Sequence, residues 1–151
     1  MTHHDFTDPL LEEIAGEVPS GFQRAMGYKL LAWNADEAML EMPIEPRHRN
    51  RAGVVHGGVL AALIDTACGF VGTWHPERGE QPGAVTLSLT TSYVSPAREG
   101  VLRVSARKRG GGTRTFFAAA EIHDQDGTLI AFGEGAFRYR SGRMRDYIAS
   151  A

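Results

Sequence analysis

The sequence predicts an α+β domain in which an antiparallel sheet wraps around one long helix. Three observations support this fold class. The first is a single long apolar segment, residues 57–74, which begins at a His-Gly-Gly junction. The second is an alternation of apolar and polar residues in two segments before it and four after it. The third is a set of tight turns that joins several of these segments as antiparallel neighbours.

The expected strands are bounded by turn-forming residues. Residues 34–36, 126–127 and the triple glycine 110–112 suit hairpin turns, and no Lys-Ser/Thr follows the glycines to make a phosphate loop. Within the third strand, Val85, Leu87 and Leu89 are expected to share one face. The strands are expected at residues 27–33, 37–44, 84–94, 101–109, 113–123 and 128–139.

A short helix is predicted near the N-terminus. Asp8 is suited to be its N-cap and Pro9 its first residue, and Pro19 is expected to end it. The chain is therefore divided into an N-terminal segment with a short helix (1–24), one main domain (25–140) and a C-terminal tail (141–151).

A basic, irregular loop, residues 45–56, leads into the central helix. His48 is expected to be a solvated residue of this loop. Arg47, Arg49 and Arg51 form either a solvated run or a contact with an anionic substrate, and the sequence favours neither interpretation.

The central helix has one bulky face and one face of small residues with a carboxylate, Asp65, in its middle. A helical projection places small residues around Asp65, so another group can approach the backbone closely there. A charge in a core setting is costly unless it is paired or used. Asp65 therefore either bonds a local group or takes part in chemistry. The bulky face carries Val59, Leu60, Leu63, Ile64, Ala67, Phe70 and Val71.

The junction before the helix carries no side chains over the first turn, because it is formed by Gly57 and Gly58. The first N–H groups of a helix are unpaired and lie at the positive end of its dipole. They suit an anion or a polarised carbonyl oxygen. Two glycines also serve an ordinary turn, so the junction alone does not define a site.

Together, these residues resemble the hotdog-fold acyl-CoA thioesterases of the phenylacetate-pathway (PaaI) type. The resemblance rests on Asn50, on His56-Gly57-Gly58 and on Asp65, eight residues after Gly57. It extends over roughly residues 25–140 and includes the strand with Thr86 and the sequence YVSPA at residues 93–97. It implies a hotdog fold and hydrolysis of acyl-CoA thioesters, with an aromatic or medium-chain acyl group, at a site between two subunits.

The resemblance also implies roles for single residues. Asp65 corresponds to the nucleophile or general base, and Gly57 to the residue that polarises the thioester carbonyl. Asn50 and His56 lie beside that carbonyl. Some relatives hold the attacking water with a Thr four residues after the acid, where this chain has Gly69. We expect Thr86 to take over that role.

The spacing on the helix predicts a dimer. Gly57 and Asp65 are eight residues apart, which is about 12 Å along a helix axis. Reacting atoms must lie about 3 Å apart, so the two residues can act on one thioester only if they come from different chains. The resemblance likewise implies a homodimer or a dimer of dimers.

Basic residues near the triple glycine are candidates for binding coenzyme A. Strand alternation puts Arg107 and Arg109 on one outward face, and arginine suits phosphate. Gly58 is expected to contact the substrate as well. The alternative, a solvated strand face, stays open.

Composition argues against several other classes. The net charge of −2 is not that of a general nucleic-acid binder. No apolar run reaches 18 residues and the N-terminus lacks signal-peptide features, so no membrane partner is expected. The single cysteine fits the cytoplasm, and the six histidines show no metal-ligand spacing, so neither metal nor cofactor is expected.

Two other functions remain as alternatives. One is a hotdog module that binds acyl-CoA without hydrolysing it, which the intact Asp65 disfavours. The other is a hotdog hydratase or dehydratase, which the lack of a His-x-x-Pro loop disfavours.

Overall fold

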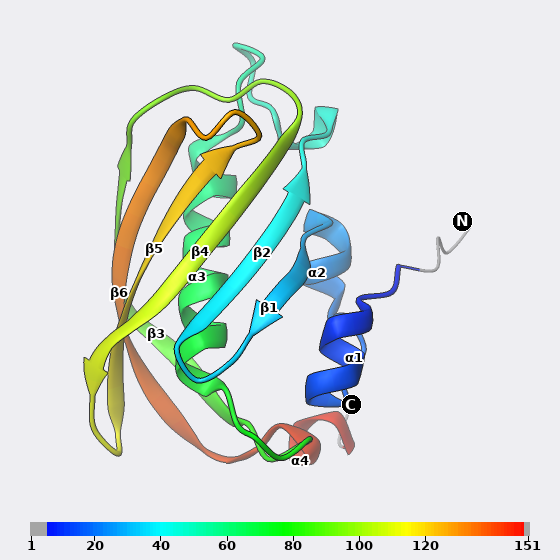
Figure 1. The fold of residues 1–151 in the computed structure, drawn as a ribbon, viewed down its shortest axis with the longest axis vertical. Coiled ribbons are helices and arrows are strands. Elements are labelled where there is room, and N and C mark those ends of the chain that lie inside the picture. Colours follow the sequence, from blue (N-terminus) through cyan, green and yellow to red (C-terminus); the bar gives the residue numbers. More distant parts are fainter. Residues whose placement is uncertain (1–5, 150–151) are drawn as a thin grey trace.

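The computed structural model describes residues 6–149 as an antiparallel sheet of six strands curved around the helix α3 (Gly57–Thr73) (Figure 1). Residues 1–5 and 150–151, the outer ends of the predicted N-terminal segment and C-terminal tail, lie outside the described part. The strand order is β1-β2-β4-β5-β6-β3, and the predicted α+β architecture is confirmed. The strands are β1 (Lys29–Trp33), β2 (Glu37–Pro43), β3 (Pro82–Tyr93), β4 (Val101–Gly111), β5 (Thr115–Asp124) and β6 (Leu129–Arg143).

The helix α3 supplies the centre of the core. Leu63 and Ile64 are fully buried against the sheet, and burial of each such side chain stabilises the fold by about 1.5–3 kcal/mol. Burial extends beyond the predicted bulky face, because Cys68 and Gly72 are buried as well. Gly72 is required by packing: a Cβ there would lie 1.9 Å from the ring of Phe116.

Strand alternation is confirmed in β2, β4 and β5, whose inward residues are buried. In β3 it is only partly right. The pairing of β3 with β6 shifts register between Thr86 and Ser88, so the residues on either side of this bulge do not alternate as expected. Val85 and Leu87 are 43% and 57% exposed, whereas Leu89 packs against the core.

The N-terminal segment forms two helices rather than one. The helix α1 (Pro9–Ala15) has Asp8 as its N-cap, as predicted, but it ends at the left-handed Gly16, before Pro19. The second helix, α2 (Gly21–Met26), was not predicted. Asp8 is completely buried. Its carboxylate tolerates burial because it also accepts hydrogen bonds from Gln23 Nε2 at 2.7 Å and Leu30 N at 2.8 Å.

Two further sequence predictions need correction. His48 is not solvated: it lies in the 3₁₀ turn η1 (Pro46–His48), 2% exposed, with Nδ1 accepting from Glu45 N at 2.9 Å and Nε2 2.8 Å from Met26 O. The last strand runs to Arg143, beyond the predicted residue 139, and is followed by α4 (Met144–Ala149). In the part of the chain described, no helix has both the length and the apolar character needed to cross a membrane.

Candidate active site

The predicted acid and hydroxyl meet where α3 faces β3. Asp65 lies near the middle of α3 and is partly buried. Thr86 Oγ1 donates a hydrogen bond of 2.6 Å to Asp65 Oδ1. Among residues 6–149 no hydrogen bond reaches the other oxygen, Oδ2. A hydroxyl bound to a carboxylate is a strong, charge-assisted contact, so Thr86 orients Asp65 and leaves one carboxylate oxygen available.

The start of α3 presents a backbone donor. His56 is the N-cap, and its Nδ1 accepts from Gly58 N at 2.8 Å. Tyr93 Oη donates to Gly57 O at 3.0 Å. Within residues 6–149, no acceptor bonds the Gly57 N–H. Of the two glycines, it is therefore Gly57 that keeps a free N–H at the positive end of the helix dipole.

Tyr93 is a contact residue that the site prediction missed. A Cβ on Gly57 would lie 3.2 Å from Tyr93 Cζ, so the ring packs directly on the glycine. Tyr93 is the first residue of the YVSPA sequence at residues 93–97, which carries part of the family resemblance.

The loop before the helix is shaped by Asn50. The side-chain Oδ1 of Asn50 accepts hydrogen bonds from Ala52 N at 2.9 Å and from Val54 N at 3.3 Å. The backbone N–H of Asn50 donates to Val54 O at 2.8 Å. His56 N donates to His48 O at 2.8 Å, which ties the loop end to the buried η1 turn. Asn50 and His56 thus lie in one loop that leads to Gly57.

The candidate residues therefore form two groups in one chain. Asp65 and Thr86 form the first, and Asn50, His56 and Gly57 belong to the second. Gly57 lies about 12 Å along the helix from Asp65. The strand β3 connects them, because Thr86 lies near its start and Tyr93 is its last residue.

Cys68 lies three residues after Asp65 but is unsuited to be a nucleophile. Burial, together with the negative charge of Asp65, raises the pKa of its thiol to about 12. A neutral, buried thiol is unreactive. Within the described chain, no three His, Cys, Asp or Glu side chains cluster so as to hold a metal ion.

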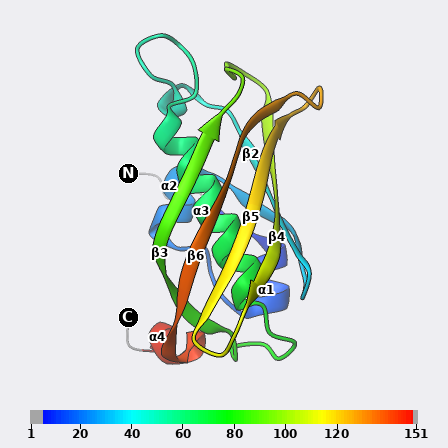
Figure 2. The same ribbon diagram turned by 90° about the vertical axis from the view of Figure 1, so that its left-hand side faces the viewer.

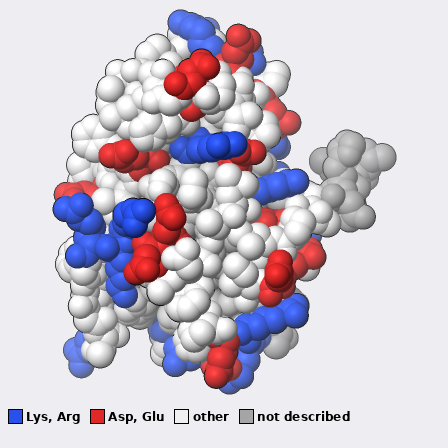
Figure 3. Space-filling view, in the orientation of Figure 1, with Lys and Arg blue, Asp and Glu red and all other residues white. Residues whose placement is uncertain are grey.

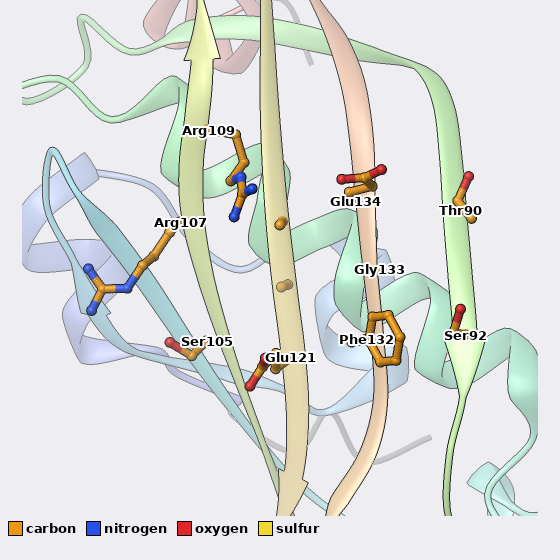
Figure 4. Close-up of a pocket in the computed structure, with 11 residues that line it drawn as sticks. Thr90, Ser92, Ser105, Arg107, Arg109, Glu121, Phe132, Gly133 and Glu134 are labelled. Carbon is orange, nitrogen blue, oxygen red and sulfur yellow. The ribbon is translucent and has the colours of Figure 1, made fainter.

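Arg107 and Arg109 lie on the outward face of the sheet, away from α3 (Figure 4). They border a hollow of about 560 Å³ together with Glu121 and Glu134. Arg107 Nη2 also lies 3.7 Å from Glu37 Oε1. Glu37, Glu121 and Glu134 therefore balance much of the positive charge of these arginines. Figure 3 shows Lys and Arg gathered at one side of the visible face, with Asp and Glu beside them.

Comparisons with known proteins agree with this fold. Residues 52–131 match the thioesterase superfamily. Acyl-coenzyme A thioesterase 13 of Mus musculus is 33% identical over 116 residues, which are 75% of this chain and 81% of that protein.

Solved structures give the same result. A variant of the phenylacetic acid degradation protein PaaI from Thermus thermophilus has a TM-score of 0.69 at 26% identity, covering 79% of this chain and 98% of that one. The E. coli PaaI protein gives 0.74 at 23% identity, covering 82% and 87%. The chain belongs to the thioesterase superfamily, and the predicted hotdog fold and PaaI-type resemblance are confirmed.

Proposed function

We propose that this protein hydrolyses acyl-CoA thioesters to a free acid and coenzyme A, at a site shared by two subunits. The observation that carries the proposal is the Asp65 carboxylate, which Thr86 holds at 2.6 Å beside the small-residue face of α3. The similarity to an acyl-coenzyme A thioesterase supports the choice of substrate class. Aromatic and medium-chain acyl groups are the first candidates.

The edge strand β3 supports the shared site. It has a hydrogen-bonded neighbour, β6, on one side only, and a long unpaired edge invites pairing with another chain. A two-fold axis at Thr90 would pair β3 with its copy. Because the bulge adds one residue between Thr86 and Ser88, this pairing sets Thr86 opposite the partner's Tyr93. Because Thr86 binds Asp65 and Tyr93 binds Gly57, this pairing brings Asp65 of one chain to Gly57 of the other. The resulting assembly is a homodimer, or a dimer of dimers if two such homodimers associate.

The proposed chemistry uses both groups. The Gly57 N–H polarises the thioester carbonyl and stabilises the oxyanion, which is worth about 10²–10³ in rate for a comparable donor. Asp65 takes a proton from water as the oxygen adds to the carbonyl carbon. The C–S bond then breaks and the leaving thiolate takes up the proton. Asn50 and His56 orient the thioester, and Gly58 contributes backbone contact.

Asp65 as a nucleophile is the second form of this mechanism. It would first form a mixed anhydride with the acyl group, which water then opens. A single turnover in ¹⁸O-labelled water tests for the nucleophile: label in Asp65 shows an anhydride that water opened at the Asp65 carbonyl, and trapping of the acyl group by hydroxylamine detects an anhydride opened at the acyl carbonyl. With a general base, label appears only in the released acid.

Thr86 is the proposed substitute for a water-holding residue at Gly69. A Cβ added to Gly69 would have no heavy atom within 4 Å, so this turn of α3 leaves open space beside Asp65. The Thr86 hydroxyl already donates a hydrogen bond to the Asp65 carboxylate, so we assign Thr86 to orienting the base.

A thiol-release screen over aromatic and straight-chain acyl-CoAs tests the proposal. We expect turnover with at least one class and none in Asp65→Asn. Tight binding without thiol release would point to a binding module instead. A change in acyl double-bond absorbance without thiol release would point to a hydratase. The buried free Cys68 suits a reducing compartment, and we place the enzyme in the cytoplasm.

A further inference from the structure

A second hollow lies on the outward face of the sheet, beside the start of β3 and the end of β6. Figure 2 shows that β3 begins and β6 ends at the same end of the sheet. Its volume is about 610 Å³. We refer to it as the arginine hollow. Val85, Thr113, Arg114, Arg138, Arg140 and Ser141 line it.

We propose that the arginine hollow binds the phosphate groups at the nucleotide end of the acyl-CoA substrate. This inference rests on the proposed function, because it identifies where that substrate is held. Guanidinium groups bind phosphate through paired N–H donors, and several on one wall suit a ligand with more than one phosphate.

The described residues place no ion-pair partner beside the arginines of the hollow. Among residues 6–149, no carboxylate lies within 4.0 Å of Arg114, Arg138 or Arg140. Arg143 and Arg145, further along the chain, both pair with Glu80. The hollow beside Arg107 and Arg109 differs, because two glutamates share it. An anion therefore gains more from the arginine hollow than from the other one.

The positions of the three arginines on the backbone bring their side chains to the same hollow. Arg138 and Arg140 are two residues apart on β6, so they project from the same face. The turn with Arg114 is tied to that strand, because Tyr139 N donates to Arg114 O at 2.9 Å. The Arg140 guanidinium lies 4.9 Å above the ring of Tyr147, which limits its rotation. The hydroxyls of Thr113 and Ser141 add two neutral donors.

The hollow is close enough to the proposed site for one substrate to reach both. Val85 lines the hollow, and the next residue, Thr86, binds Asp65 from the other face of β3. With Thr86 opposite the partner's Tyr93, residues 82–85 extend past the end of the partner's strand. The flexible arm of coenzyme A would cross the sheet edge at this overhang, between phosphates outside and thioester inside.

A pair of matched double variants tests the inference. Arg138→Gln with Arg140→Gln removes two charges from the arginine hollow, and Arg107→Gln with Arg109→Gln removes two from the charge-balanced hollow. Both lower the net charge equally, so general electrostatic attraction changes alike. We measure kcat and KM for acyl-CoA and for the matching acyl-pantetheine, which lacks all phosphates. Calorimetry measures binding of adenosine 3′,5′-bisphosphate, with inorganic phosphate as a comparison.

We expect the first double variant to raise KM for acyl-CoA about tenfold or more, because charge-assisted hydrogen bonds are lost, with kcat nearly unchanged. Its KM for acyl-pantetheine should not move, and bisphosphate binding should weaken in parallel. The second double variant should change these values less than about twofold. Inorganic phosphate should compete only at much higher concentration than the bisphosphate.

Other results overturn the inference. A KM effect in the Arg107 and Arg109 variant alone would move the nucleotide to the hollow predicted from the sequence. Equal effects in both would mean general attraction without a built site. Bisphosphate binding that needs Arg138 and Arg140, in a protein that hydrolyses no thioester, would keep the hollow and reject the proposed function. Turnover with unchanged KM in the first double variant would keep the proposed function and reject the arginine hollow as the phosphate site.

Discussion

The proposed activity depends on the charge of Asp65, and one substitution can remove this charge while keeping the contacts of the side chain. Asn has nearly the same size and can still accept the Thr86 hydrogen bond. Asp65→Asn should therefore fold, dimerise and bind acyl-CoA, with kcat lower by about 100-fold or more because the base or nucleophile is lost. Thermal unfolding and steady-state kinetics check this. The exposed turn variant Asp36→Asn is the control and should keep full activity; near-normal turnover in Asp65→Asn would reject the catalytic role.

Glu17 gives a second residue-level prediction, because burial raises its pKa from 4.5 to about 7. Between these values the folded chain keeps a proton that the unfolded chain has lost, so stability falls as pH rises from about 4.5 to 7. Glu17→Gln removes this loss. Since Glu17 is partly exposed, we expect a gain of only about 1 kcal/mol, or about 2–4 °C in Tm, at pH 8.

At pH 4 the Glu17→Gln variant and the parent protein should unfold at the same temperature. The exposed Glu13→Gln variant on α1 is the matched control and should follow the parent at both pH values. A Glu17→Gln gain of equal size at pH 4 and pH 8 would show that titration of Glu17 is not its cause.

At the scale of elements, the sequence predicted what local patterns encode. The Asp8-Pro9 pair marked the start of α1, and periodicity located α3 and the strands. The bulge in β3 has no such signature, because the apolar alternation of Val85, Leu87 and Leu89 continues through it. The burial of His48 depends on Met26, 22 residues away, and could not be inferred from a basic loop.

Asp8 joins three elements and is predicted to be a major contributor to stability. Its carboxylate caps α1 and also binds Gln23 of α2 and Leu30 of the first strand, β1. Asp8→Ala removes the cap, leaves the buried Leu30 N–H unpaired and leaves Gln23 Nε2 with only Tyr28 O, so we expect a loss of about 2–4 kcal/mol. Urea unfolding measures it. Ser20→Ala, which removes only the cap of α2, should cost about 1 kcal/mol. Equal losses in the two variants would mean that the long-range bonds of Asp8 add nothing.

At the scale of the whole molecule, the sequence identified the separation of the site into two groups but not how they meet. The eight residues between Gly57 and Asp65 follow from counting along a helix. The position of β3 at the sheet edge, with Thr86 and Tyr93 along it, required the strand order, which alternation does not encode. We expect sedimentation at working concentrations to give a dimer or larger. A fully active monomer would reject the shared site.

The shared site has a stricter test, which uses two inactive variants. Asp65→Asn lacks the base, and Gly57→Pro lacks the N–H that we assign to the oxyanion. Proline suits the first position of a helix, although the Tyr93 ring must shift by a few tenths of an ångström to admit it. Each homodimer has two damaged sites. In a heterodimer, one site carries both defects and the other carries neither. After subunit exchange in an equal mixture, half of the dimers are mixed and half of their sites are intact, so activity should return to about a quarter of the parent value. Activity should stay absent when either variant is exchanged with itself. If both variants are folded, exchange is shown by mass measurement and no activity returns, then Gly57 and Asp65 do not serve one thioester from different chains.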